Sequence, residues 1–227
     1  MRDLPAALLI DMDGTVVDTE PYWMASEMAL VAEFGGTWTD DDAHSIVGFD
    51  LLDSAEQLRA RGGVDLAPHA IVERLLDSVI ERCRVELPWR PGARELLLDA
   101  GRREVPAVLV TMSWRRLAGA VLDAAPRGVF AGSVTGDEVD RGKPHPEPYL
   151  RAAASLGVEP ATCLAIEDSP TGIAAAVSAG CATVAVPHMV PVDDEAGRVV
   201  VETLVGTDVA GLWRVAEGAR RQDPAAS

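Results

Sequence analysis

The chain has 227 residues, of which 48% are apolar and only 4% aromatic, so it can bury one large aliphatic core or a core with a smaller insert. Its formal net charge of −16 argues against nucleic acid or an anionic membrane as a partner. The three cysteines lack metal-type spacing, no apolar run reaches membrane length, and the first residues lack the long apolar stretch of a signal peptide. We therefore expect a cytoplasmic protein with reduced thiols.

A buried strand is predicted over residues 7–10, and it runs directly into Asp11 and Asp13. Helical patterns without any strand pattern then continue as far as Pro88. The first of these helices is expected to bury a face with Met24, Met28 and Val31, and a later one a face with Ile71, Leu75, Val79 and Cys83. We interpret residues 17–88 as a helical cap domain inserted after the first strand.

Strand and helix patterns alternate over the rest of the chain. Further buried strands are predicted in PAVLVT, VFAGSVTG, CLAIED and ATVAVP, and helices in PGARELLLDAGR, HPEPYLRAAASLG and SPTGIAAAVSAG. In the last helix, Ser169 is a predicted N-cap and Pro170 the first helical residue. The alternation predicts an α/β fold with a Rossmann-like parallel sheet and helices on both faces, formed by residues 1–16 and 89–220. Residues 221–227 are expected to be a disordered tail.

Polar side chains follow several of the predicted strands. They are Asp11 and Asp13 after the first strand, Thr111 and Ser113 after the second, Lys143 in the loop after the third, and Glu167 and Asp168 at the end of the fourth. Lys143 is the only lysine in the chain. Because ligands of open α/β sheets bind beyond the carboxyl ends of the strands, we expect these side chains to form one site.

Phosphoryl transfer through an aspartyl phosphate is the chemistry that needs this set of groups. One carboxylate attacks phosphorus, and a second protonates the leaving oxygen and then activates water; Asp11 and Asp13, two residues apart on extended chain, face the same way. A divalent cation between Asp11 and the acids of the fourth strand would relieve their repulsion, and hard oxygen ligands suit Mg²⁺. Thr111 and Lys143 can bind phosphoryl oxygens, while Gly14 lets the backbone turn and present amides to the phosphate.

Four segments in order, DMDGT, VLVTMS, GKPHPEPYL and IEDSPTGIAAAVSAG, resemble the motifs of the haloacid dehalogenase-like hydrolase superfamily. The helical insert resembles that of its C1-capped branch, which contains phosphoglycolate phosphatases and β-phosphoglucomutases. The resemblance implies that Asp11 is the nucleophile and Asp13 the general acid/base. It implies phosphate binding by Thr111, Met112, Lys143 and Gly14. It implies a Mg²⁺ site formed by Asp11, Asp168 and the backbone carbonyl of Asp13, with Glu167 as an assisting ligand or a group behind the ligands.

Among members of this superfamily, the sequence favours a phosphatase. Asp13 argues against a dehalogenase, because a halide leaves without protonation, and the insert contains no lysine for the Schiff base of a phosphonatase. β-Phosphoglucomutases usually carry a histidine, an arginine and a lysine in the insert, whereas Trp23 and Asp50 stand near two of those places here. Ser113 is interpreted as the N-cap of the next helix rather than as a ligand.

We therefore expect a monomeric, Mg²⁺-dependent phosphatase that acts on a small phosphorylated metabolite, such as a sugar or polyol phosphate. A phosphomutase of the β-phosphoglucomutase type is the main alternative. A catalytically idle relative that only binds or regulates is a further one, which Mg²⁺-dependent turnover would exclude.

Overall fold

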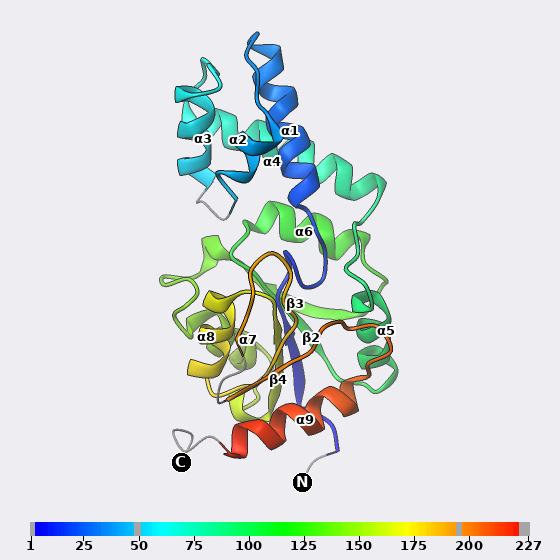
Figure 1. Cartoon of the computed structure of the whole chain (residues 1–227). Helices are drawn as coiled ribbons and strands as arrows, with labels where there is room; N and C mark the ends of the chain where they lie inside the picture. The colour runs from blue at the N-terminus through cyan, green and yellow to red at the C-terminus, as the bar shows by residue number, and fades with distance from the viewer. Residues whose placement is uncertain (1–2, 48–50, 194–196, 223–227) are drawn as a thin grey trace. The chain divides into compact units, whose positions relative to one another are not determined.

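The computed structural model describes residues 3–47, 51–193 and 197–222. The chain divides into two compact units (Figure 1): an α/β unit, Met1–Asp18 with Pro88–Ser227, and a helical unit, Thr19–Leu87. Within the described residues, the α/β unit contains the whole sheet and the helical unit contains only helices and turns.

The sheet of the α/β unit is parallel throughout and has the strand order β3-β2-β1-β4-β5-β6. The strands are β1 Ala7–Ile10, β2 Ala107–Val110, β3 Phe130–Val134, β4 Cys163–Glu167, β5 Ala182–Ala185 and β6 Arg198–Val200. In the centre, Leu8 pairs with Ala107 on one side and with Leu164 on the other. Strands β1, β2, β4 and β5 are buried along their whole length, which is why they read as unbroken apolar runs. The predicted parallel sheet is confirmed.

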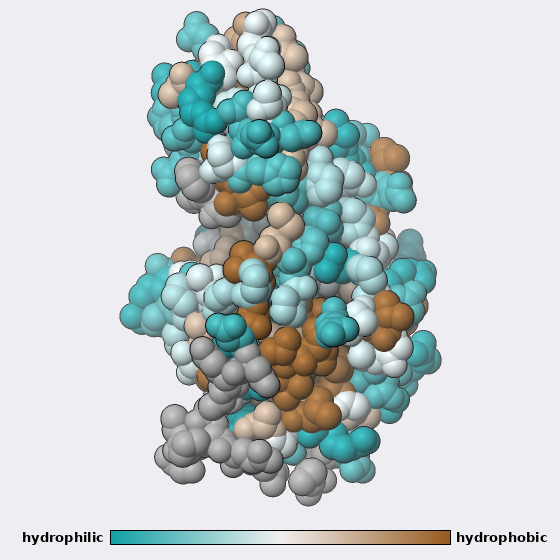
Figure 2. Space-filling view, viewed as in Figure 1, coloured by the Kyte–Doolittle hydropathy of each residue, from teal (hydrophilic) through white to brown (hydrophobic). Residues whose placement is uncertain are grey.

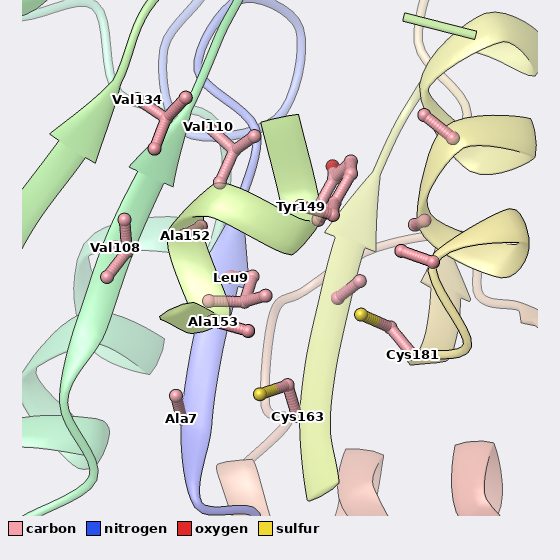
Figure 3. Packing of buried hydrophobic residues seen from close by; sticks show 14 residues of the cluster. Ala7, Leu9, Val108, Val110, Val134, Tyr149, Ala152, Ala153, Cys163 and Cys181 are labelled. Carbon is pink, nitrogen blue, oxygen red and sulfur yellow. The ribbon is translucent and has the colours of Figure 1, made fainter. Parts of the chain in front are cut away.

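Helices cover both faces of this sheet, as predicted. They are α5 Ala93–Arg102, α6 Arg115–Ala124, α7 Glu147–Ser155, α8 Pro170–Ser178 and α9 Val209–Gln222, with 3₁₀ turns at Gly136–Glu138 and Pro160–Thr162. One face of β1, with Ala7 and Leu9, packs against α7 and α8 in a small-residue core (Figure 3). Leu8 and Ile10 point the other way and are equally buried. Helix α5 contacts β2, α9 contacts β4 and β5, and the two helices contact each other.

Two elements of this unit were not predicted. β6 has three partly buried residues at the sheet edge, too short for a clear apolar pattern. α9 extends to Gln222, two residues into the predicted tail, whose remaining residues 223–227 lie outside the described part of the chain. By contrast, the start of α8 is as predicted, since the Ser169 side chain accepts a hydrogen bond from the Gly172 amide and Pro170 begins the helix.

The helical unit consists, within the described residues, of α1 Glu20–Glu33, α2 Asp40–His44, α3 Leu51–Ala60 and α4 Pro68–Val85. α4 buries the four residues predicted for it. For α1 the predicted face is confirmed at Val31, which is buried, but Met24 and Met28 are only partly covered. The other buried residues of this helix are Ser26, Glu27 and Leu30. Glu27 is buried, and its carboxylate accepts a hydrogen bond from Trp38 Nε1 at 3.2 Å. Asp50, noted in the sequence, lies outside the described residues.

The surface in Figure 2 is mostly hydrophilic, in keeping with the large negative charge, and apolar side chains gather in a patch on the α/β unit. Exposed large apolar residues of this unit include Met189, Val190 and Val205. Among the helices of the described residues, none has both the length and the apolar character needed to cross a membrane.

Candidate active site

Neighbouring strands deliver the predicted acids and the hydroxyl to one edge of the sheet. The backbone pairing continues one residue past the strands: the Asp11 amide donates to the Ile166 carbonyl at 3.0 Å, and the Thr111 amide to the Val134 carbonyl at 3.0 Å. Glu167 is the last residue of β4, next to β1. The carboxyl ends of β1, β2 and β4 therefore place these side chains together.

Lys143 reaches the same edge from the loop before α7. Its ammonium group donates to Asp11 Oδ1 and to Glu167 Oε1, each at 2.5 Å, and to the Val110 carbonyl at 2.9 Å. An ammonium group has three protons, and here each has an acceptor. Burial lowers the pKa of Lys143, but the charges of Asp11 and Glu167 outweigh that effect and raise the pKa above its ordinary value. These contacts favour the charged form of Lys143, whose ammonium group holds Asp11 in place.

Three carboxylates converge around this lysine. Oxygens of Asp11, Glu167 and Asp168 lie within 4.8 Å of one another. Burial raises the pKa of Asp11 well above its ordinary value, Lys143 lowers it, and the charges of Glu167 and Asp168 raise it further. Burial, with the charge of Glu167, also raises the pKa of Asp168 to about 7. One lysine cannot neutralise three carboxylates, so this group of oxygen donors fits a hard divalent cation such as Mg²⁺.

Asp13 lies beside the end of β2. Ser113 Oγ donates to Asp13 Oδ2 at 2.7 Å. The expectation that Ser113 caps the following helix is wrong: the N-cap of α6 is Trp114, and that helix has no side-chain cap bond. The Ser113 hydroxyl instead donates its hydrogen bond to Asp13.

Thr111, Met112 and Gly14, which were expected to bind phosphate, differ from one another in their contacts. Thr111 is buried and its Oγ1 accepts from the Ser113 amide at 3.0 Å, so the hydroxyl keeps its own proton to donate. The Met112 sulfur accepts from the Lys143 amide at 3.2 Å and so supports the lysine loop. At Gly14, φ is +86° and an added Cβ would lie 2.1 Å from an Asp168 carboxylate oxygen.

Gly14 was expected to let the backbone turn and present amides to the phosphate, and its own amide donates to the Val17 carbonyl at 2.7 Å. The residue is needed for the turn and for the close approach of Asp168. Its role as a phosphate ligand stays a prediction.

Two contacts of Glu167 were not foreseen. The buried Tyr149 hydroxyl donates to Glu167 Oε1 at 2.7 Å, and its ring lies 5.4 Å from Lys143 Nζ. Figure 3 shows the Tyr149 ring between α7 and the carboxyl end of β4. Ser169 Oγ donates to Glu167 Oε2 at 3.2 Å. The sequence could have predicted such a contact, because Tyr149 stands on an apolar helix face and a buried tyrosine hydroxyl needs a hydrogen-bond partner.

Together these residues can support attack by a buried carboxylate, proton transfer by a second carboxylate, and binding of an anion by a hydroxyl and an ammonium group. Such a set suits transfer of a phosphoryl group to Asp11 and then to water.

Comparisons with known proteins point the same way. The family model of the haloacid dehalogenase-like hydrolases matches residues 5–180. Hexitol phosphatase B of Escherichia coli (strain K12) is 30% identical over 192 residues, which cover 80% of this chain and 83% of that protein. Fructose-1-phosphate phosphatase YqaB of the same organism is 30% identical over 181 residues, 79% of this chain and 95% of that one. The crystal structure of CbbY from Rhodobacter sphaeroides in complex with phosphate matches with a TM-score of 0.78 at 25% identity, covering 92% of this chain and 99% of that one.

Proposed function

The chain belongs to the haloacid dehalogenase-like hydrolases, and on that premise we propose that it is a Mg²⁺-dependent phosphatase of a small phosphorylated sugar or polyol. The observation that carries the proposal is the ion pair between Asp11 and the buried Lys143. A second acid, Asp13, follows two residues after Asp11 and accepts its own hydrogen bond from Ser113. This arrangement supplies an oriented nucleophile and a separate proton-transfer group in one site.

The reaction proceeds in two steps on these residues. Asp11 attacks phosphorus and forms an aspartyl phosphate, while Asp13 donates a proton to the leaving alcohol oxygen. Asp13 then takes a proton from water, which attacks the aspartyl phosphate and releases inorganic phosphate. Lys143 fixes the attacking carboxylate, and the Thr111 hydroxyl donates to a phosphoryl oxygen on which charge builds up.

Mg²⁺ would be held by Asp11, Asp168 and the Asp13 carbonyl, with Glu167 beside them. Bound there, the ion supplies positive charge that offsets the acids and the phosphoryl oxygens. The support for this assignment is the excess of carboxylate over ammonium charge among the described residues of the site.

A sugar or polyol monophosphate is the proposed substrate class. It is supported by two relatives of similar length, whose names specify a hexitol phosphatase and a fructose-1-phosphate phosphatase. We also propose that the chain acts as a monomer in the cytoplasm and that residues 17–88 act as a cap over the substrate, as expected from the sequence.

The test is phosphate release from a panel that includes sorbitol 6-phosphate and fructose 1-phosphate, with Mg²⁺ or with EDTA. We expect Mg²⁺-dependent release that falls by at least about 10⁴-fold in Asp11→Asn, because the amide is not a nucleophile. Asp123→Asn, an exposed aspartate of α6, is the matched control and should keep wild-type rates. Wild-type turnover by Asp11→Asn would contradict the assignment.

The same samples separate hydrolysis from phosphate relocation. Conversion of glucose 1-phosphate to glucose 6-phosphate without net phosphate release would support the mutase alternative instead. Absence of turnover on the whole panel would favour a binding relative.

A further inference from the structure

Ser113 is held rigidly at the end of β2. Its amide donates to Thr111 Oγ1 at 3.0 Å, and its carbonyl accepts from the Gly136 amide at 3.1 Å. Gly136 itself is closely packed, since an added Cβ would lie 2.2 Å from the Met112 carbonyl oxygen. Both backbone polar groups of Ser113 are therefore fixed, the amide to the end of its own segment at Thr111 and the carbonyl to the segment that contains Gly136.

From this fixed position the Ser113 hydroxyl contacts Asp13 Oδ2 at 2.7 Å. A hydroxyl can donate to a carboxylate and can also accept from a carboxylic acid. The contact can therefore persist whether Asp13 is ionised or protonated. It links residues 100 positions apart in the sequence, across the β1–β2 boundary of the sheet.

We propose that Ser113 is a positioning residue for proton transfer by Asp13, an inference that rests on the function proposed above. By engaging Oδ2, the serine limits rotation of the carboxylate and keeps Oδ1 directed at one place during both half-reactions. Small errors of orientation slow proton transfer strongly, because the donor and acceptor must be within hydrogen-bond reach. Ser113 thus affects only the steps in which Asp13 gives or takes a proton.

The inference separates substrates by their leaving group. The alkoxide of a sugar or polyol must be protonated as it leaves, whereas p-nitrophenolate is a weak base that leaves without help. With p-nitrophenyl phosphate, the first step therefore bypasses Asp13, and only the attack of water on the aspartyl phosphate still needs it.

The experiment compares Ser113→Ala with wild type on p-nitrophenyl phosphate by stopped flow, and on fructose 1-phosphate in steady state. We expect a burst of p-nitrophenolate, close to one equivalent, at a rate within about threefold of wild type, followed by slow turnover. On fructose 1-phosphate, kcat should fall by about 10- to 100-fold with KM within about threefold. Ser113→Thr, which keeps the hydroxyl, should restore kcat to within about fivefold.

Three results would overturn the role of Ser113. The first is wild-type kcat in Ser113→Ala. The second is a raised KM with unchanged kcat, which would indicate that Ser113 contacts the substrate. The third is an equal fall in the burst rate and in turnover on both substrates. Asp11→Asn is measured alongside. If Asp11→Asn is inactive and Ser113→Ala gives any of these results, the inference alone fails; if Asp11→Asn stays active, the proposed function fails and the inference with it.

Discussion

Glu27 of α1 is a buried acid whose charge should destabilise the helical unit at neutral pH. Its side chain is buried, and its carboxylate accepts a hydrogen bond from Trp38 Nε1. Burial raises the pKa of Glu27 from 4.5 to about 7; the hydrogen bond from Trp38 opposes this, and the charge of Glu20 adds to it. We predict that Glu27→Gln, which keeps an acceptor of the same shape but removes the charge, stabilises the helical unit at alkaline pH.

The magnitude follows from the raised pKa. An acid with a higher pKa in the folded state binds its proton more tightly when folded, so stability falls as pH rises from 4.5 through 7. At about 1.4 kcal/mol for each pH unit, the penalty reaches at most about 3 kcal/mol at pH 8 and is below about 1 kcal/mol near pH 4.5. The benefit of Glu27→Gln should grow by that amount over this range.

Hydrogen exchange of α1 peptides, read by mass spectrometry between pH 4.5 and 8, measures the opening free energy of this region. Glu81→Gln, at an exposed position of α4, is the matched control and should change the opening free energy by less than about 0.5 kcal/mol at every pH. A benefit of Glu27→Gln that is the same at pH 4.5 and pH 8 would refute the reasoning, because it would have no link to ionisation.

Two further substitutions test the packing around Glu167. An added Cβ at Gly172 would lie 2.0 Å from the Glu167 carboxylate, so Gly172→Ala should lower the free energy of unfolding, measured in urea, by about 1–3 kcal/mol. The control is Gly119→Ala in α6, where an added Cβ meets open space and should raise the free energy of unfolding by about 0.5–1 kcal/mol. Equal effects of the two substitutions would contradict the close packing at Gly172. Tyr149→Phe keeps the ring but removes the donor to Glu167 Oε1, so we expect a loss of about 1–2 kcal/mol in urea unfolding and a lower kcat, because Lys143 shares that oxygen. Unchanged stability and kcat would show that the hydroxyl contributes nothing.

The residues of the site could be predicted where local pattern and topology were enough. Asp11 and Thr111 directly follow apolar strands, and Glu167 ends another, so a parallel sheet places all three at the same edge. They meet there because β1 lies between β2 and β4. The start of α8 at Ser169 was equally readable, because a cap is a local property of a few residues.

Other features depended on contacts that no local pattern contains. A serine between a strand and a helix fits a cap and a site contact equally well, and only the approach of β1 to β2 decides that Ser113 contacts Asp13. The bond from Tyr149 to Glu167 depends on how α7 packs over the sheet. In α1, the apolar spacing favoured the methionines, but the partner Trp38 lets Glu27 take a buried place.

The solitary lysine has a practical consequence for chemical labelling. Every other basic side chain of the protein is arginine or histidine, so Lys143 carries the only side-chain amine. Its side chain is 5% exposed, and its ammonium group is held by two carboxylates. An acylating reagent can reach that amine only when the α/β unit opens and the proton is released. The N-terminal amine also reacts with such a reagent, so peptide mapping has to separate the two products. The slow gain of an acyl group on the peptide that contains Lys143 would then report the rate at which the catalytic edge of the sheet opens.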